Sequence, residues 1–298
     1  MKGNRIQLSI IILSWNTAKL LKQCLNSLKF EIRNSKFEII IVDNGSTDGS
    51  VEMIESIVMD QLPITIKLIK NKDNLGFTKA NNQGIKQACG KYIMLLNSDT
   101  IVSPGSIEKL IVFLENNINI GIVGPRLLNS DGSWQANCGK FPNIFNVFVM
   151  LFLEHLEQTD KVRWAPEVSG KIDWLMGAAF IARREIFEKV GGLDEKIFMY
   201  MEEVDWFYRA KQAGFEAYFL KDAQIVHLGR GSSKSGKKDP IVNIYKGTAY
   251  FFQKHKTKFE ASLVKIMLKF KAILAIILGT LKNDQYLKET YGEAIKVI

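Results

Sequence analysis

The chain has 298 residues, of which 47% are hydrophobic and 24% charged, a composition that excludes an intrinsically disordered protein. Its 40 lysines and arginines outnumber 31 aspartates and glutamates, which gives a formal net charge of +9 at pH 7. Such a charge favours acidic partners such as nucleotides, pyrophosphates, nucleic acid or anionic lipid, without choosing among them.

The cysteines and the apolar runs restrict the compartment. Three cysteines lie far apart and form no Cys-x-x-Cys pair, so neither a disulfide framework nor a cysteine zinc site is indicated. The first apolar run ends at Trp15, too early for a signal peptide, and no run reaches the ~20 apolar residues of a spanning helix. We therefore expect a cytoplasmic protein, with membrane contact that is peripheral and on the inner face of the cell membrane.

In the first half of the chain, short β-branched runs alternate with helical stretches. The predicted strands and helices are Ile6–Leu13, Ala18–Phe30, Phe37–Val42, Asp48–Val58, Ile64–Ile69, Phe77–Ala88, Tyr92–Leu96 and a helix opened by Ser103-Pro104. This rhythm predicts an α/β fold with a mostly parallel sheet covered by helices on both faces. In such sheets ligands bind beyond the carboxyl ends of the strands.

In the second half the rhythm breaks. The expected features in chain order are a strand at Ile120–Val123, loops over Asn129–Pro142, an apolar stretch at Ile144–Leu153, apolar residues over Trp174–Ala182, a helix at Arg183–Val190, a strand at Ala223–Val226 and a basic loop at Gly229–Lys238. A Lys-rich helical segment follows. We expect a catalytic domain over residues 1–233, and a basic loop with a C-terminal helical extension over residues 234–298.

Polar residues follow the first three predicted strands, and they are candidates for binding a nucleotide: Ser14, Trp15, Asn16, Asp43, Asn44, Asn74 and Gly76. From the end of a strand the Asp43 carboxylate can accept hydrogen bonds from a base imide or a ribose hydroxyl. A plain turn is the alternative, and for Asp48 a helix cap is the preferred interpretation. Gly76 permits close approach of a ligand, and the following helix offers its amide hydrogens to phosphate.

The fourth predicted strand ends in Asn97 and Asp99, which would point the same way. Asn97 is a further candidate for binding the nucleotide, and Asp99 is a candidate metal ligand. Mg²⁺ or Mn²⁺ requires few protein oxygen ligands alongside the phosphates that it bridges. A single carboxylate provides few protein ligands for a metal ion, and His227 is the candidate for a further ligand. A histidine packed in the core is the alternative for that residue.

The densest cluster of acids contains Glu202, Glu203 and Asp205, interleaved with aromatic residues. An acidic helix start in which Asp205 pairs with Arg209 is one interpretation, and we accept it for that pair. For Glu203 we favour a general base, because an apolar wall and a second acid raise the pKa of a carboxylate toward useful values.

At these residues the sequence resembles the family 2 glycosyltransferases with a GT-A fold, in their rhamnosyltransferase-like branch. From about Leu8 to Ser233 the markers are, in order, Ser-Trp-Asn, Val-Asp-Asn-Gly-Ser-Thr-Asp, Asn-Leu-Gly-Phe, Leu-Asn-Ser-Asp-Thr, Asp-Gly-Ser, Gly-Ala-Ala-Phe, Gly-Gly-Leu-Asp-Glu, Glu-Glu-Val-Asp-Trp and His-Leu-Gly-Arg-Gly-Ser-Ser. The resemblance implies that Asp43 holds the base or ribose, that Asp99 ligates the metal on the donor diphosphate, and that His227 completes metal binding.

Two motifs depart from the family pattern. The usual Asp-x-Asp reads Asn97-Ser98-Asp99, and the usual Glu-Asp pair reads Glu202-Glu203, which leaves the base open among Glu202, Glu203 and Asp205. The implied reaction is inverting transfer of a sugar from a nucleoside diphosphate, with dTDP-rhamnose as first candidate and a UDP-sugar as second. The expected acceptor is a hydroxyl of a lipid-linked or polysaccharide chain in cell-surface glycan synthesis.

Other functions and partners stay open. A sugar-nucleotide nucleotidyltransferase would carry a Gly-rich basic loop after the first strand, which is missing, and a catalytically reduced nucleotide-sugar-binding or membrane-surface module is a further alternative. The segment Lys258–Lys282 predicts an amphipathic helix that rests on an anionic membrane or packs on the catalytic domain or a second subunit. Homo-oligomerisation is compatible with this segment, and no nucleic-acid partner is expected.

Overall fold

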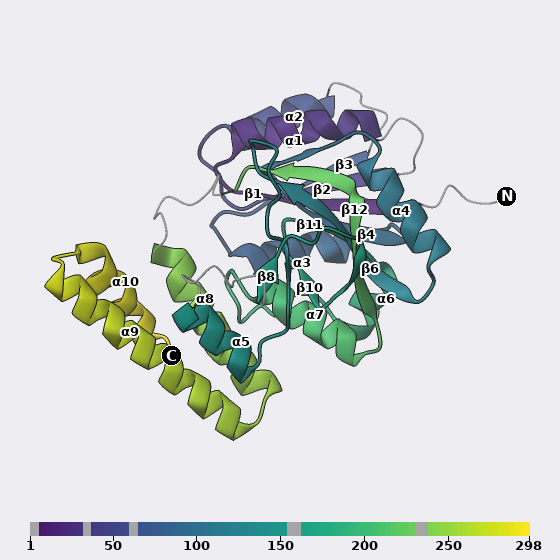
Figure 1. The fold of residues 1–298 in the computed structure, drawn as a ribbon. Helices are drawn as coiled ribbons and strands as arrows, with labels where there is room; N and C mark the ends of the chain where they lie inside the picture. Colours follow the sequence, from purple (N-terminus) through teal and green to yellow (C-terminus); the bar gives the residue numbers. More distant parts are fainter. Residues whose placement is uncertain (1–5, 32–36, 60–64, 154–161, 230–237) are drawn as a thin grey trace.

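A computed structural model describes residues 6–31, 37–59, 65–153, 162–229 and 238–298. Over these ranges the centre of the molecule is a nine-stranded mixed sheet whose main path runs β3-β2-β1-β4-β11-β6-β12-β5 (Figure 1). Helices cover both faces of the sheet, as the sequence predicts. The α/β fold class is therefore confirmed.

Four parallel strands form one half of the sheet: β1 (Leu8–Ser14), β2 (Phe37–Asp43), β3 (Thr65–Lys70) and β4 (Tyr92–Asn97). The three inner strands are almost entirely buried, which suits their β-branched sequences. Ser14 is in register with Asp43, and Leu13 with Asn97. The polar residues that end these strands therefore meet at one edge of the sheet.

Two hydrophobic cores lie on opposite faces of this sheet. On one face Ile10 and Ile12 pack against α1 (Ala18–Glu31), α2 (Ser50–Met59) and α4 (Ser106–Asn116). On the other, Ile11 belongs to the core formed with α3 (Phe77–Gln87), α6 (Arg184–Val190) and α7 (Glu202–Gln212). Successive strand residues point to opposite faces, so each strand contributes to both cores.

The helix predicted to open at Ser103-Pro104 begins instead at Ser106. Gly105 precedes it with a φ of 77°, a left-handed conformation that interrupts helical geometry. The prolyl residue thus lies in the turn before the helix and not in its first turn.

The other half of the sheet contains antiparallel pairs. Its strands are β5 (Thr100–Val102), β6 (Ile120–Leu128), β9 (Gly170–Ile172), β11 (Ala179–Arg183) and β12 (Glu216–His227). β11 is antiparallel to β4 and β6, whereas β12 is parallel to β6 and antiparallel to β5. The register between β12 and β5 sets His227 opposite Thr100, next to Asp99.

A small second sheet lies within the region predicted as loops and apolar runs. It has the order β10-β7-β8, with β7 (Cys138–Gly139), β8 (Arg163–Trp164) and β10 (Trp174–Leu175). The apolar stretch predicted at Ile144–Leu153 forms α5 (Ile144–Phe148) and a π-helical turn, η1 (Val149–Leu153).

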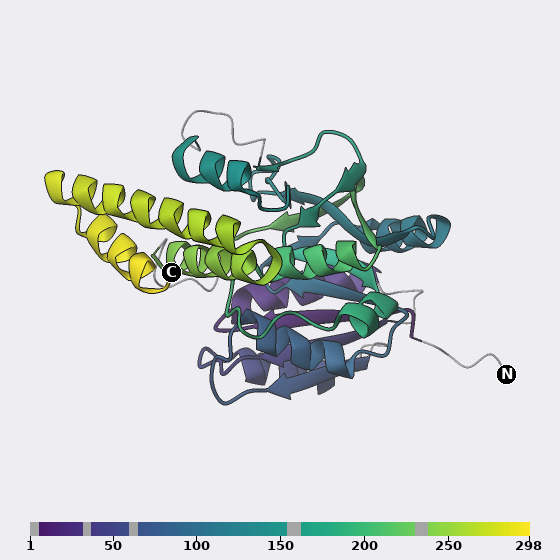
Figure 2. The same cartoon turned by 90° about the horizontal axis from the view of Figure 1, so that it is seen from below.

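Three helices end the chain: α8 (Lys238–His255), α9 (Lys258–Leu281) and α10 (Gln285–Lys296). In Figures 1 and 2 they form an arm that extends away from the sheet. A third hydrophobic core, with Val204 of α7 and Phe251 and Phe252 of α8 among its members, joins the arm to α5, η1 and α7. The predicted helix Lys258–Lys282 is therefore confirmed to within one residue, whereas most of the predicted basic loop lies outside the described residues.

No helix in the described ranges is long and apolar enough to cross a bilayer.

Candidate active site

The carboxyl ends of β1, β2 and β4 are joined by hydrogen bonds between polar side chains. The Ser14 and Thr17 hydroxyls lie 3.2 Å apart, and the Thr17 hydroxyl donates to Ser98 Oγ at 3.0 Å. Asn16, with a φ of 54°, accepts a hydrogen bond from the Thr47 amide at 2.8 Å. These hydrogen bonds hold in place the edge of the sheet at which the sequence predicts nucleotide binding. The half-buried Trp15 lies at the same edge.

Asp43 has an unsatisfied oxygen at this edge. Its side chain is almost fully buried, and Oδ1 accepts a hydrogen bond from the Ser46 amide at 2.9 Å. Its Oδ2 is buried and finds no hydrogen-bond donor among the described residues. Because an unpaired buried carboxylate oxygen is costly, Oδ2 suits a ligand that brings its own N–H or O–H donor.

Asn44 and Asn74 are occupied by the protein itself. The buried Asn44 amide donates to Asn74 Oδ1 at 2.8 Å, and its Oδ1 accepts from the Leu75 amide at 3.1 Å. Asn74 Oδ1 also accepts from the Gly76 amide at 2.9 Å. Both residues thus shape the loop before α3.

Gly76 adopts a φ of 86°, and a Cβ at this position would lie 2.5 Å from the Phe198 ring. The close approach that the sequence suggested for a ligand is therefore made by Phe198. The Phe77 amide at the start of α3 donates to the Phe198 carbonyl at 2.8 Å, so it is also taken. Gly76 therefore allows α3 to pack closely on the loop before α7. A β-carbon at this position would push that loop away.

Asp99 and His227 are brought together from distant parts of the sequence. The pairing of β12 with β5 places His227 Nε2 3.4 Å from Asp99 Oδ1, and both side chains are about nine-tenths buried. Among the described residues no three His, Cys, Asp or Glu side chains gather as a metal cluster. A cation held by Asp99 and His227 would leave coordination positions for oxygens of a substrate and for water.

Gln135 orients His227, and no local sequence pattern marked it. The Gln135 amide nitrogen donates to the His227 carbonyl at 3.2 Å, which fixes its orientation, and Oε1 lies 2.7 Å from His227 Nδ1. Because Oε1 can only accept, Nδ1 carries the proton in the neutral ring. Nε2 then has a free lone pair, and it is this nitrogen that lies near the Asp99 carboxylate. Two acceptors at this distance suit a cation between them, and the Asp99–His227 pair fits a divalent metal.

The third cluster begins with an unusual turn. Tyr200 and Met201 have φ values of 66° and 72°, and α7 starts directly after them at Glu202. Non-glycine residues in this region cost of the order of 1–3 kcal/mol each, and they persist only where neighbours hold them. Gly247 of α8 packs on this turn so closely that a Cβ there would lie 2.8 Å from Met201 Cβ.

Glu202 and Glu203 have buried Oε2 atoms without a hydrogen-bond donor among the described residues. Burial raises the pKa of Glu202 well above its usual value, and the neighbouring charge of Glu203 adds to this. Burial also raises the pKa of Glu203, although backbone hydrogen bonding and the positive charge of Arg163 oppose the effect. The pair therefore holds a proton at higher pH than an ordinary glutamate does.

Glu203 lies at the same edge as the polar strand ends. Its Cβ is 3.8 Å from the position that a Cβ on Gly177 would take, and the adjacent Ala178 carbonyl accepts the Asn97 amide at 2.9 Å. Glu203 therefore packs beside the segment that is hydrogen-bonded to the end of β4, two residues before Asp99.

Asp205 is fully buried and surrounded by cations. It pairs with Arg209 Nε at 2.8 Å, as the helical spacing predicts, and with Lys254 and His255 of α8 at 2.7 Å each. Burial alone would raise its pKa, but hydrogen bonds from His255, Lys254 and Arg209 hold it well below the usual range. Asp205 thus fastens α8 to α7, and its oxygens are engaged there.

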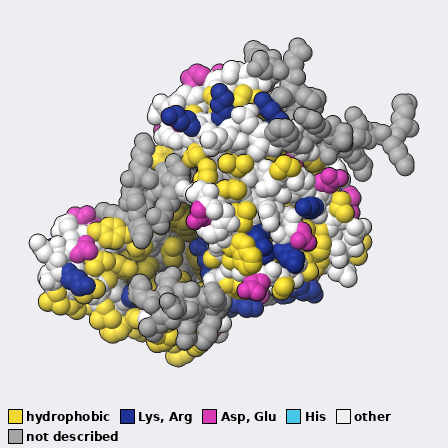
Figure 3. Space-filling view, turned by 45° about the horizontal axis from the view of Figure 1, so that its top comes forward, with side chains coloured by type: hydrophobic (Ala, Val, Ile, Leu, Met, Phe, Trp, Pro, Cys, Tyr) yellow, Lys and Arg dark blue, Asp and Glu magenta, His cyan; other side chains and the backbone are white. Residues whose placement is uncertain are grey.

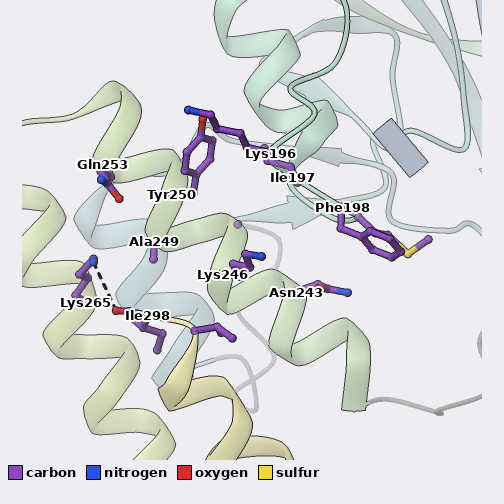
Figure 4. Close-up of a pocket in the computed structure, with 13 residues that line it drawn as sticks. Lys196, Ile197, Phe198, Asn243, Lys246, Ala249, Tyr250, Gln253, Lys265 and Ile298 are labelled. Atoms are coloured by element: carbon purple, nitrogen blue, oxygen red, sulfur yellow. Dashed lines mark hydrogen bonds between the residues drawn. The ribbon is translucent and has the colours of Figure 1, made fainter. Parts of the chain in front are cut away.

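A cavity of about 160 Å³ lies beside the turn, between the residues before it and α8. Figure 4 shows Phe198 from the preceding loop, with Asn243 and Lys246 from α8. Lys196 and Lys265 also line the cavity, and no acidic residue does. α8 therefore supports the turn and forms one wall of a basic cavity.

Comparison with known proteins identifies the family. Residues 9–208 match the profile described as Glycosyl transferase family 2. A Mycobacterium tuberculosis protein, N-acetylglucosaminyl-diphospho-decaprenol L-rhamnosyltransferase, is 24% identical over 283 residues, covering 86% of this chain and 87% of the relative.

Solved structures show the same fold. Mannosyltransferase PcManGT from Pyrobaculum calidifontis, in complex with GDP-Man and Mn²⁺, has a TM-score of 0.60 at 14% identity, covering 98% of this chain and 86% of that one. S. aureus TarS in complex with UDP-GlcNAc has a TM-score of 0.59 at 16% identity, with 97% and 79% covered. With a GT-A fold and a family match over two thirds of its length, the chain belongs to glycosyltransferase family 2 and is a nucleotide-sugar glycosyltransferase.

Proposed function

We propose that the protein is an inverting, divalent-metal-dependent glycosyltransferase that transfers rhamnose to a hydroxyl of a lipid-linked acceptor. One observation supports the mechanism: the Asp99–His227 pair and Glu203, whose pKa is raised, lie at one edge of the sheet. Glu203 packs beside Gly177, and the next residue, Ala178, is hydrogen-bonded to Asn97 at the end of β4.

The proposed donor site uses the strand ends. Asp43 Oδ2 accepts a hydrogen bond from the base or ribose, a role supported by its burial without a partner. Asp99 and His227 Nε2 would hold the metal, and Mg²⁺ or Mn²⁺, when bound, would neutralise the charge of the diphosphate leaving group. Gln135 would keep the Nε2 lone pair available by accepting a hydrogen bond from Nδ1–H.

Glu203 is the proposed general base. It takes the proton from the acceptor hydroxyl while that oxygen attacks the anomeric carbon on the face opposite the diphosphate, which inverts the configuration. Its raised pKa and partial exposure support this role over Glu202, which is almost fully buried. Asp205 is not proposed as base, because Arg209, Lys254 and His255 already engage its carboxylate.

The donor and acceptor are proposed from the relatives. The name of the M. tuberculosis relative states an L-rhamnosyl transfer to a diphospho-decaprenol, which supports dTDP-rhamnose as donor and a polyprenyl diphosphate sugar as acceptor. The complex of TarS with UDP-GlcNAc supports a UDP-sugar as the second donor candidate.

A donor panel tests this proposal. The purified protein is incubated with Mn²⁺, a lipid-linked sugar acceptor and each of dTDP-rhamnose, UDP-GlcNAc, UDP-glucose and GDP-mannose, and released nucleoside diphosphate is measured. We expect acceptor-dependent release of dTDP and a product of inverted anomeric configuration. Binding of every donor without turnover would favour a binding module, and pyrophosphate formation from a nucleoside triphosphate and a sugar phosphate would favour a nucleotidyltransferase.

A further inference from the structure

The helix α9 is apolar on the side that faces away from the protein. Its inner side packs on the arm through buried small and aliphatic residues at helical spacing, namely Val264, Leu268, Ala272, Ala275 and Gly279. Its outer side carries Phe259, Leu263, Ile266, Phe270, Ile273, Leu274, Ile277 and Leu281, here called the α9 stripe. A helix that packs on a protein normally turns charged residues to water, so this outer side is unusual.

The α9 stripe is continuous and exposed. At about 100° per residue its eight members fall within an arc of about 100°, opposite the buried side, and every residue of α9 in that arc is apolar. Ile266 is 64% exposed, Phe270 54% and Leu281 80%. Figure 3 shows hydrophobic side chains gathered over the arm that contains α9. Large exposed apolar patches of this kind mark interaction surfaces.

A second element extends the stripe. α5 and η1 pack beside α9, and the Phe152 ring of η1 lies 6.1 Å from the Phe270 ring. Phe145 and Phe148 of α5 are 61% and 44% exposed. Two elements from distant parts of the chain thus present aromatic and aliphatic side chains together.

The charges beside the stripe identify its partner. On the helical projection Lys258 and Lys269 border one side of the stripe, and Lys271 borders the other. Glu260 is the only acidic residue of α9, and its carboxylate is occupied by the capping box with Thr257. Lysines at the edge of an apolar face reach toward anionic headgroups, whereas a second copy of the same face would bring its own excess of lysines.

We propose that the α9 stripe, with Phe145 and Phe148, docks the protein on an anionic lipid bilayer, with α9 lying parallel to the membrane surface. A helix in this position buries its apolar side to a depth of about 5–10 Å in the headgroup and acyl boundary. α9 packs on α8, whose Gly247 supports the turn before Glu202, so the docked helix is joined to the proposed base through α8. The docking proposal holds for any acceptor and does not depend on the donor.

Flotation of the full-length protein with vesicles tests the proposal. The vesicles contain phosphatidylcholine alone or phosphatidylcholine mixed with phosphatidylglycerol. The test variant is Ile266→Glu with Phe270→Glu, and the matched control is Ile118→Glu with Val168→Glu, two exposed apolar residues outside the arm. Truncation is avoided, because removal of α9 would uncover the third core.

We expect wild type and control to float with the anionic vesicles, and the test variant to bind at least tenfold more weakly. Lys258→Gln and Lys269→Gln should each weaken binding about fivefold at low salt, corresponding to roughly 1 kcal/mol per lysine, and less at high salt. Circular dichroism and thermal unfolding verify that each variant is folded.

Two results would overturn the proposal. The first is equal flotation of the test variant and wild type. The second is a wild-type dimer in lipid-free solution, measured by light scattering, that the test variant alone dissociates while neither protein binds vesicles. That second result would assign the stripe to an interface between two copies of the chain.

Discussion

Asp99 and His227 depend on each other and on Gln135 for their proposed role. The carboxylate and the ring nitrogen lie 3.4 Å apart, and Gln135 determines which nitrogen carries the proton. Removing the negative charge from Asp99 should weaken any cation held between them. We expect Asp99→Asn to lower metal-dependent turnover by about 100-fold or more, with little change in unfolding temperature, because the residue serves the ion. A near-normal rate in saturating Mn²⁺ would show that Asp99 is not the metal ligand.

Gln135 is a positioning residue, and its effect should be on metal affinity. In Gln135→Leu the imidazole loses the acceptor that fixes its tautomer. The Mn²⁺ concentration that gives half-maximal rate should rise about 10- to 100-fold, as for other partners of metal ligands, whereas the rate at saturating Mn²⁺ changes less. Gln135→Glu retains the acceptor and should restore most of the affinity. An equal loss in both variants would argue for a purely structural role.

Glu203 and Glu202 should respond differently to loss of their charge. Glu203→Gln should lower the rate by ~10² to 10⁴-fold without weakening donor binding, because the base acts on the acceptor. In the wild type the rate should fall as pH drops through the raised pKa of the pair, a limb that lies above the ordinary glutamate range. Full activity of Glu203→Gln beside an inactive Glu202→Gln would reassign the base.

The stability effect of Glu202 has a definite sign. Its folded pKa is raised, so the folded protein binds a proton more tightly than the unfolded chain, and the residue destabilises the fold once pH exceeds its unfolded pKa. Glu202→Gln should therefore raise the unfolding temperature at pH 8, and the gain should vanish near pH 4. A lower unfolding temperature at pH 8 would contradict this interpretation.

At the scale of elements, α8 fastens the C-terminal arm to α7 through Asp205. Asp205→Asn leaves Arg209, Lys254 and His255 without their shared anion, and loss of one partner of a buried ion cluster typically costs about 3–5 kcal/mol. Because the folded pKa of Asp205 is depressed, its contribution is fully present above the unfolded pKa and is lost gradually as pH falls from there through the folded pKa. Urea titrations should therefore give the full difference between wild type and variant at pH 7 and a smaller difference at pH 3.

α8 also supports the turn before the catalytic helix, and Gly247 tests this contact. A Cβ at Gly247 would lie 2.8 Å from Met201 Cβ and 3.0 Å from the Tyr200 carbonyl oxygen, so Gly247→Ala should shift the turn and lower the rate about tenfold or more. Gly292→Ala in α10 is the matched control, because nothing lies within 4 Å of its Cβ position. If both variants kept full activity, the turn would not need support from α8.

At the scale of the whole molecule, the sequence predicts the layers of the fold better than its long-range contacts. The buried strands have a local signal, since Ile-rich runs such as Ile39–Val42 are apolar throughout. The sequence therefore predicts the ends of the first four strands to within one residue, and with them the edge that carries Ser14, Asp43 and Asn97. The strand predicted at Ile120–Val123 continues to Leu128. The pairing of β12 with β5 has no local signal, because it joins segments more than 100 residues apart.

The same limit applies to the functional contacts. Motifs in the sequence predict Asp99, His227 and Glu203 as site residues. Their geometry, however, depends on Gln135 and Gly247, which no local sequence motif marks. Lys254 and His255 likewise read as the end of a basic helix, although they neutralise Asp205 from 49 and 50 residues away. The ligand approach predicted for Gly76 was replaced by Phe198, a contact set by tertiary packing.

The most direct test of the account is the release of nucleoside diphosphate from dTDP-rhamnose, followed in real time with a lipid-linked acceptor on anionic vesicles. We expect release only when donor, acceptor and Mn²⁺ are all present, loss of release in EDTA, and at most about 1% of the wild-type rate for Asp99→Asn and Glu203→Gln. Undiminished release in EDTA, or from both variants, would contradict it.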